Sequence, residues 1–285
     1  MKPAPFAYHA PRSVAEAVAM LGALAAADGR ILAGGQSLVP AMAFRLAKPA
    51  HLIDINAIAA LERLAVEDGA LSIGACVRHA AFHRPPVAGP LGALLANVVR
   101  YIAHYPIRLR GTFCGSLAHA DPASEWCLLA ATLGAEMTAV STRGTRTIAA
   151  EDFFAGIMTT ALAEDELLAA ARLPLLAADA RFGFCEFSRR AGDYAIAMAL
   201  AILRVEGGVI VAPRLGVGGA EAVPRRIAEA EAALAGQPPE PAVLRAAADA
   251  AADAVDPLED IQADAAYRRD LVRAMTRRAL ERACA

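Results

Sequence analysis

Residues 33–37, with the sequence Ala-Gly-Gly-Gln-Ser, have types that suit the binding of a phosphate group. Two adjacent glycines let backbone N–H groups approach an anion, and the N-terminus of a helix expected to follow adds a favourable dipole. The segment lacks the Lys-Ser/Thr pair of a P-loop and the spacing of the Rossmann dinucleotide fingerprint. It predicts a phosphate-binding loop of another kind or, as the alternative, an ordinary tight turn in which Ser37 caps the helix.

A second stretch with similar chemistry covers residues 110–122. Two glycines and two hydroxyl side chains in it offer hydrogen-bond donors that suit phosphate or ribose. The carboxylates of Asp121 and Glu125 could accept hydrogen bonds from ribose or adenine groups. The alternative is that Asp121 begins a turn and caps the helix that follows Pro122.

A third segment, residues 189–195, reads Arg-Arg-Ala-Gly-Asp-Tyr-Ala. Tyr194 on a glycine turn could lie against a flat ligand, and the alternative is a packed aromatic with a satisfied hydroxyl. The two arginines fit either salt bridges or solvated surface charges.

Other kinds of site find little support. His79 and His83 are spaced i, i+4 without the glutamate of a zinc protease, so we expect a pair on a helix surface. There is no Gly-x-Ser-x-Gly elbow or Ser/His/Asp order for hydrolysis. The five cysteines are scattered, with no Cys-x-x-Cys pair, which argues against a disulfide framework, structural zinc or an iron–sulfur cluster on this chain.

The composition narrows the class of protein. A formal net charge of −2 over 285 residues leaves no broad basic footprint for nucleic acid. With 57% hydrophobic and 20% charged residues, the chain is expected to be folded rather than disordered. The longest apolar run, residues 194–203, is shorter than the roughly 20 residues that span a bilayer, and the N-terminus lacks a signal-peptide pattern. We therefore expect a cytoplasmic protein that does not insert into membranes.

These segments must be positioned by a mixed α and β chain. The N-terminal part predicts a compact strand–helix–strand unit with parallel strands and a preceding helix that begins at Ser13. Its expected elements are a helix at 14–26, a strand at 30–33, a helix at 38–46 and a strand at 51–55. The middle part is strand-rich, with residues 107–119 expected as a polar, glycine-interrupted stretch. Its expected elements are a strand at 70–75, helices from about Arg78, over 91–102 and from after Pro122 to 133, and a hairpin of 136–141 with 145–148.

A boundary is expected near residues 173–175, and an antiparallel sheet with a helical tail should follow it. Glu206-Gly207-Gly208 is a strong hairpin signal between two strands. The expected elements are strands at 182–188, 197–205 and 209–217, and helices at about 226–234, 241–254 and 265–284.

Taken together and in this order, the motifs resemble the FAD-binding (medium) subunit of the molybdenum hydroxylases, the carbon monoxide dehydrogenase and xanthine dehydrogenase family. The resemblance is carried by residues 33–40 with Arg45-Leu46 and 51–56, by residues 107–123, and by residues 184–195. Three ordered motifs are far more specific than any one alone, and the resemblance covers nearly the whole chain.

The resemblance implies an α+β fold. It would consist of a PCMH-type FAD-binding domain over residues 1–175, with two α/β subdomains of about 1–56 and 57–175, and a C-terminal domain over 176–285 with an antiparallel sheet and a helical bundle. The implied activity is electron transfer within an oxidoreductase complex. FAD would accept electrons from iron–sulfur clusters on a small partner subunit and pass them to an external acceptor, while the molybdenum cofactor lies on a large molybdopterin subunit. A heterotrimer or a dimer of heterotrimers is implied.

The resemblance also implies which residues contact FAD. Both glycine loops would hold its diphosphate, Ile102 and Leu168 would line it, Tyr194 would lie near the isoalloxazine, and no protein residue is named as catalytic. The implied cofactor-binding residues are Leu32, Ala33, Gly34, Gly35, Gln36, Ser37, Leu38, Ile102, Thr112, Phe113, Cys114, Gly115, Ser116, Asp121, Glu125, Leu168 and Tyr194.

Two positions depart from the family pattern. Cys114 stands where a glycine is usual, and it would weaken FAD binding or shift the loop if that position required positive φ or a close approach of the backbone. Glu125 stands where aspartate is more common. Two alternatives stay open: a self-contained flavin-dependent oxidoreductase, and an assembly subunit with weakened FAD binding.

Overall fold

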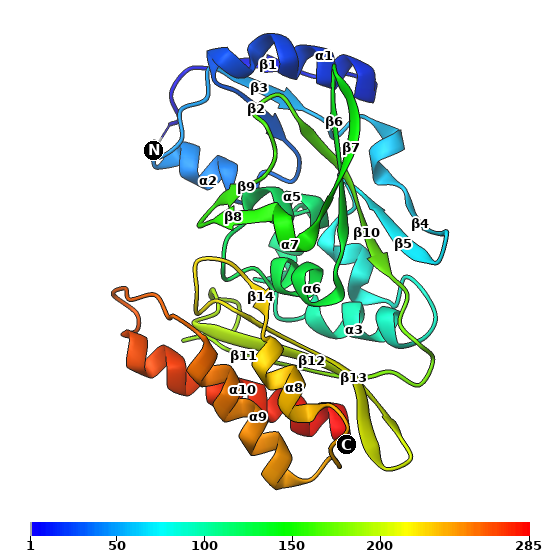
Figure 1. Ribbon diagram of the computed structural model, residues 1–285. Coiled ribbons are helices and arrows are strands. Elements are labelled where there is room, and N and C mark those ends of the chain that lie inside the picture. Colours follow the sequence, from blue (N-terminus) through cyan, green and yellow to red (C-terminus); the bar gives the residue numbers. More distant parts are fainter. Residues whose placement is uncertain (1) are drawn as a thin grey trace.

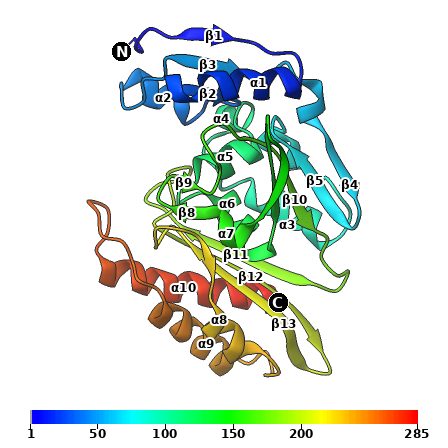
Figure 2. The same ribbon diagram turned by 45° about the horizontal axis from the view of Figure 1, so that its top comes forward.

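The computed structural model describes residues 2–285, which form stacked layers of sheet and helix (Figure 1). A small parallel sheet with the N-terminus lies at one end, a five-stranded sheet with several helices lies in the middle, and a four-stranded sheet with three helices lies at the other end. Figure 2 shows the same order of layers from a second direction. The expected α+β architecture is confirmed.

The N-terminal layer is a parallel sheet in the order β1–β3–β2. Its elements are β1 (Ala7–His9), α1 (Val14–Leu24), a 3-10 turn (Ala25–Ala27), β2 (Gly29–Leu32), α2 (Leu38–Ala43) and β3 (His51–Asp54). Ser13 caps α1 as expected, since its hydroxyl accepts a hydrogen bond from the Glu16 amide. α2 is shorter than the expected 38–46, because Arg45 takes a left-handed backbone with φ 58°. β1 was not expected, because three largely exposed residues at a sheet edge carry no alternating pattern.

The middle layer is an antiparallel sheet in the order β4–β5–β10–β6–β7. Its strands are β4 (Leu64–Glu67), β5 (Ala70–Gly74), β6 (Glu136–Ser141), β7 (Gly144–Ala149) and β10 (Leu167–Pro174), with a separate two-stranded ribbon of β8 (Phe154–Gly156) and β9 (Thr159–Thr160). The helices are α3 (Pro90–Val98), α4 (Tyr105–Arg108), α5 (Phe113–His119), α6 (Glu125–Leu133) and α7 (Ala150–Phe153), with 3-10 turns at Ala59–Glu62 and His79–His83.

Two local expectations in this layer were wrong, and a third was right only in part. The helix expected from about Arg78 is only the 3-10 turn His79–His83, because Pro85 and Pro86 stop any continuation. The polar stretch expected over residues 107–119 is largely helical, forming the end of α4 and all of α5. Asp121 does begin a turn, with its Oδ1 accepting the Ala123 amide at 2.9 Å, but the residue before α6 is Ser124.

The C-terminal layer is an antiparallel sheet in the order β11–β12–β13–β14 covered by helices on one face. Its elements are β11 (Arg181–Phe187), β12 (Ala197–Glu206), β13 (Val209–Gly218), β14 (Arg225–Arg226), α8 (Ala228–Leu234), α9 (Pro241–Ala254) and α10 (Ala265–Cys284). The predicted β12–β13 hairpin turns at Gly207 and Gly208, both with positive φ, as a tight hairpin requires.

Strand β12 joins two hydrophobic cores because its side chains alternate between the faces of the sheet. Met198, Leu200 and Ile202 pack into the core shared with the middle layer. Ala199 and Ala201 lie in the core beneath the C-terminal helices. Helix α6 contacts β10 on one side and β13 on the other, so it ties the two layers together.

Candidate functional site

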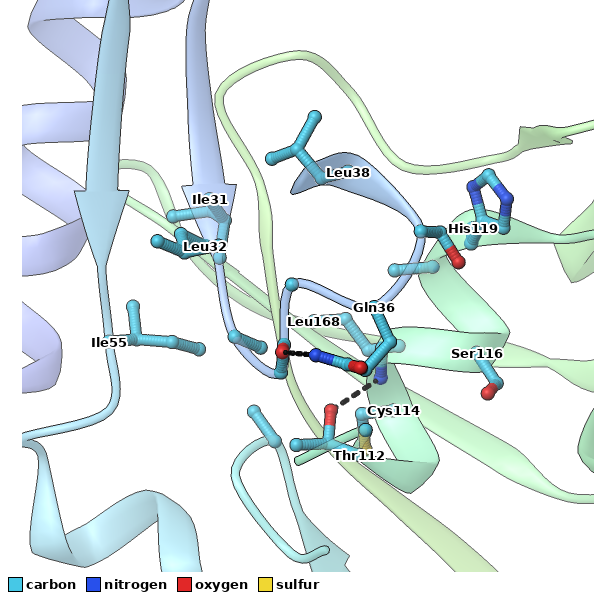
Figure 3. A pocket seen from close by; sticks show the side chains of 18 of the residues that line it. Ile31, Leu32, Gln36, Leu38, Ile55, Thr112, Cys114, Ser116, His119 and Leu168 are labelled. Atoms are coloured by element: carbon cyan, nitrogen blue, oxygen red, sulfur yellow. Dashed lines mark hydrogen bonds between the residues drawn. The ribbon is translucent and has the colours of Figure 1, made fainter. Parts of the chain in front are cut away.

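A cavity of about 390 Å³ lies where the parallel sheet meets the middle layer. This volume is within the usual range for small-molecule sites. The loop after β2 forms one wall, and α5 with the start of β10 forms another (Figure 3). The predicted residues that line it are Leu32, Ala33, Gly34, Gly35, Gln36, Ser37, Leu38, Thr112, Cys114, Gly115, Ser116 and Leu168. Three segments that are far apart in the chain therefore meet at one cavity.

The loop after β2 keeps unused backbone donors at this cavity. Within residues 2–285, the N–H groups of Gly34, Gly35, Gln36 and Ser37 donate no hydrogen bond. Gly35 has φ +71°, and the side-chain amide of Gln36 donates to the Gly34 carbonyl at 2.9 Å (Figure 3). Because α2 has only six residues, these free amides are a stronger feature than the helix dipole expected from the sequence.

The second loop, within residues 110–122, uses its backbone N–H groups differently from what the sequence suggested. Thr112 is the N-cap of α5, and its Oγ1 accepts a hydrogen bond from the Gly115 amide at 3.0 Å (Figure 3). The Phe113 amide donates to the Val77 carbonyl at 3.1 Å, so neither amide is free for a ligand. Ser116 lines the cavity and brings a hydroxyl side chain to it.

A network of hydrogen bonds holds the two loops against each other. The side-chain amide of Asn56 donates through Nδ2 to the Ala33 carbonyl at 2.8 Å. Its Oδ1 accepts a hydrogen bond from the Arg78 guanidinium at 2.7 Å. The other end of that guanidinium donates to the Arg110 carbonyl. The cavity wall is therefore preorganised by Asn56 and Arg78, which sequence reasoning did not single out as site residues.

Cys114 is compatible with its place in the structure. It lies in α5 with an ordinary helical backbone, and its thiol is buried and donates to the Ile73 carbonyl at 3.4 Å. Burial raises the pKa of this thiol far above its usual value. The position does not require positive φ, so that reason for a glycine does not apply to Cys114.

Five predicted residues lie outside the cavity lining. Ile102 is in the hydrophobic core, and the Phe113 ring packs 5.0 Å from the Trp126 ring. Tyr194 is 63% exposed on the turn that follows Gly192, which has φ +85°. Asp121 and Glu125 lie at the turn and first residue of α6. The expected contacts of these five residues with FAD stay predictions.

Glu125 faces a second buried carboxyl group, Glu186 on β11. The two side chains share a hydrogen bond, and Glu186 Oε2 is buried with no partner in residues 2–285. Burial raises the pKa of both carboxyls above the ordinary value of 4.5, and for Glu186 the neighbouring Glu125 raises it further. One proton shared between the carboxyls accounts for their close approach.

His79 was expected on a helix surface, and that expectation was wrong. Its side chain is 4% exposed, lines the cavity and has Nδ1 3.0 Å from the indole Nε1 of Trp126. A histidine within an Ala-rich segment gives no sequence signal for this position, because the contact with Trp126 spans 47 residues.

Over residues 2–285, no cluster of three or more His, Cys, Asp or Glu side chains is placed to hold a metal ion. All five cysteines are free thiols. No helix in that range is both long and apolar enough to cross a bilayer.

Two family models match the chain in succession. The model described as the FAD binding domain in molybdopterin dehydrogenase matches residues 4–176, and that of the CO dehydrogenase flavoprotein C-terminal domain matches residues 182–283. The chain belongs to the FAD-binding medium subunits of the molybdenum hydroxylases. Its cofactor is FAD, and it is a subunit of an oxidoreductase. The resemblance inferred from the motifs is confirmed.

Individual relatives agree with this membership over the full length. The chain is 37% identical to the nicotine 6-hydroxylase medium subunit of Paenarthrobacter nicotinovorans, covering 96% of this chain and 95% of the relative. It is 35% identical to the carbon monoxide dehydrogenase medium chain of Hydrogenophaga pseudoflava, covering 100% and 99%.

Solved structures of medium subunits have the same fold. The carbon monoxide dehydrogenase from Hydrogenophaga pseudoflava that lacks the Mo-pyranopterin moiety superposes with a TM-score of 0.95 at 38% identity, covering 100% of this chain and 99% of the other. Quinoline 2-oxidoreductase from Pseudomonas putida 86 gives 0.92 at 37% identity, covering 99% and 98%.

Proposed function

We propose that this medium subunit is the point at which electrons leave a molybdenum hydroxylase complex. Bound FAD supplies the chemistry, because a flavin can take up single electrons and release them in pairs. In this proposal the electrons come from iron–sulfur clusters on a small partner subunit and go to an external acceptor. The substrate is oxidised on a molybdopterin large subunit, and the complex is a cytoplasmic heterotrimer or a dimer of heterotrimers.

The observation that carries the proposal is the convergence of the two glycine loops on one cavity. Residues 34–37 offer four unused N–H groups there, which suit the oxygens of a diphosphate. Ser116 adds a hydroxyl, and Leu168 adds an apolar surface. A cavity with unused amides on one wall and aliphatic side chains on another fits a dinucleotide better than a small organic substrate.

The division of labour follows from the donor groups of this chain. Its thiols form no disulfide, and residues 2–285 offer no group of three or more side chains placed to hold a metal ion. Iron–sulfur clusters are therefore assigned to a partner subunit. The two relatives named above are themselves medium subunits by name, which supports assembly with further subunits.

The residues outside the cavity lining are given peripheral roles in this proposal. Tyr194 would contact the isoalloxazine from its exposed turn, and Asp121 and Glu125 would lie near polar groups of the nucleotide. Ile102 would support this region from the core. Phe113 would act through packing, since its ring lies against Trp126 and supports the start of α5.

Reconstitution of the complex with and without flavin tests the proposal. The full-length chain, stripped of flavin and titrated with FAD, should bind one equivalent and acquire flavin absorbance. The complex reassembled with this subunit should reduce a dye acceptor only when FAD is present, while reduction of the iron–sulfur clusters by substrate should proceed either way.

Two outcomes would overturn the proposed route. Equal rates of acceptor reduction with flavin-free and FAD-loaded subunit would remove this subunit from the electron path. Turnover of an organic substrate by the isolated chain would favour the self-contained oxidoreductase instead.

A further inference from the structure

His79 occupies a position from which it can reach both the cavity and the second loop. It begins the 3-10 turn that follows β5, and its ring forms part of the cavity wall. Its backbone N–H donates to the Gly111 carbonyl at 2.9 Å. Gly111 in turn lies against Gly34, because a β-carbon on Gly34 would be 2.7 Å from the Gly111 Cα. His79 therefore lies where the two loops meet.

Trp126 determines which ring nitrogen of His79 carries the proton. The indole Nε1–H can only donate a hydrogen bond, and it lies 3.0 Å from His79 Nδ1. Nδ1 must therefore be the acceptor, which leaves the proton of the neutral imidazole on Nε2. Trp126 is fully buried beside Phe82 and Phe113, so this contact is held rigidly.

The imidazole is neutral in the folded protein. Burial, and after it the positive charges of Arg108 and Arg78, lowers the pKa of His79 to about 3. A cationic histidine is thereby excluded at ordinary pH, and the ring can offer only one donor besides its contact with Trp126.

That donor, Nε2–H, lacks an acceptor. No side-chain or backbone acceptor for Nε2 is found within residues 2–285. The atom is also not among the polar atoms of that range that are fully buried without a partner. It lies against the Cα of Gly111, where an added β-carbon would be only 2.5 Å from Nε2. A donor that faces the cavity in this way is available to an acceptor on a bound ligand.

We propose that His79 is a neutral hydrogen-bond donor to the diphosphate of bound FAD, with its tautomer held by Trp126 and its approach made possible by Gly111. The proposal rests on the proposed function in one respect, namely that this cavity is the FAD site. The diphosphate is chosen because Nε2 lies beside the junction with Gly34, where the unused loop amides begin.

Two substitutions of His79 separate its two hydrogen bonds. In His79→Asn, the side-chain oxygen can still accept from Trp126, but no donor reaches the position of Nε2. In His79→Gln, an amide N–H can reach that position, while the acceptor for Trp126 is lost. His83→Asn is the matched control, since His83 belongs to the same 3-10 turn but does not line the cavity.

The test measures FAD affinity of the full-length flavin-free chain by fluorescence titration, together with the ³¹P signals of the bound diphosphate. We expect His79→Asn to weaken FAD binding by about tenfold to a hundredfold, as loss of a hydrogen bond to a charged acceptor does. It should also shift a ³¹P signal. His79→Gln should recover part of the affinity, and His83→Asn should leave affinity and spectrum unchanged.

A measurement on the unmodified protein keeps the test decisive even if the variants do not fold. The ¹⁵N chemical shifts of the His79 ring at neutral pH should show protonation at Nε2 only, and FAD should move the Nε2 resonance. An Nδ1–H tautomer, a doubly protonated ring, or an Nε2 resonance unaffected by FAD would overturn the proposal.

Gly34→Ala distinguishes a failure of this inference from a failure of the FAD site. If Gly34→Ala weakens FAD binding but His79→Asn does not, the cavity is the FAD site and His79 is not a donor to it. If neither substitution changes FAD binding, the assignment of the cavity is itself wrong.

Discussion

A β-carbon placed on Gly34 would lie 2.3 Å from the carbonyl oxygen of Arg110. This distance is far below van der Waals contact, so the two loops can touch only because residue 34 has no side chain. The functional importance of Gly34 therefore comes from a close approach between loops 76 residues apart. Its backbone does not need positive φ, whereas that of the neighbouring Gly35 has φ +71°.

We predict that Gly34→Ala lowers FAD affinity by at least about tenfold, because the loops must separate to admit the methyl group. Flavin titration of the full-length chain measures the effect. Gly22→Ala is the matched control, since its β-carbon would lie 3.4 Å from Thr142 and an alanine within α1 adds up to about 1 kcal/mol of helix stability. Unchanged FAD affinity in Gly34→Ala would mean that this contact between the loops does not shape the FAD site.

Asn56 allows the contact between the two loops to be tested without introducing a steric clash at Gly34. Asn56→Ala removes the hydrogen bonds to Ala33 and Arg78, so the Arg78 guanidinium loses half of its anchoring. We expect a loss of about 1–2 kcal/mol in unfolding free energy and a several-fold weaker affinity for FAD. Asn97→Ala, on the exposed face of α3, should change neither quantity. Equal values for the two variants would mean that the network does not organise the site.

Cys114 is predicted to be a packing residue rather than a defect in the loop. Cys114→Gly should lower the unfolding free energy by about 1–2 kcal/mol, because a helix position loses intrinsic propensity and a buried side chain is removed. It should not increase FAD affinity. Cys114→Ala keeps the helix propensity and should cost less. An increase in affinity in the glycine variant, measured by the same titration, would contradict this interpretation.

Much of the fold could be predicted from local sequence patterns, and the site only in part. The hairpin at Gly207 and Gly208 and helices α9 and α10 follow from turn residues and periodicity, which act over short distances. The burial of His79 could not be predicted, since Trp126, the partner of its side chain, lies on α6. Similarly, the Gly115 amide was expected to face a ligand, but Thr112 accepts its hydrogen bond. Residue types indicated the right loops, while long-range contacts decide which atoms remain free.

The Glu125–Glu186 pair predicts how stability depends on pH. Because both carboxyls have a raised pKa in the folded state, the folded protein binds more protons than the unfolded chain above the ordinary glutamate value of 4.5. The contribution of the pair is thus complete below that value and is lost as the pH rises through the folded-state pKa values. The contribution of the pair to stability should therefore fall from pH 5 towards pH 8.

Glu186→Gln tests this pH dependence directly. The glutamine amide can donate a hydrogen bond to the Glu125 carboxylate at any pH, whereas the two carboxyls need a shared proton. At pH 8 we expect the variant to be more stable than the unmodified protein by about 1 kcal/mol, and at pH 5 to be equal or less stable. Urea unfolding at the two pH values measures the difference. Glu164→Gln, in the exposed turn before β10, is the control and should follow the unmodified protein at both pH values. If Glu186→Gln also follows the unmodified protein, the two carboxyls do not share a proton.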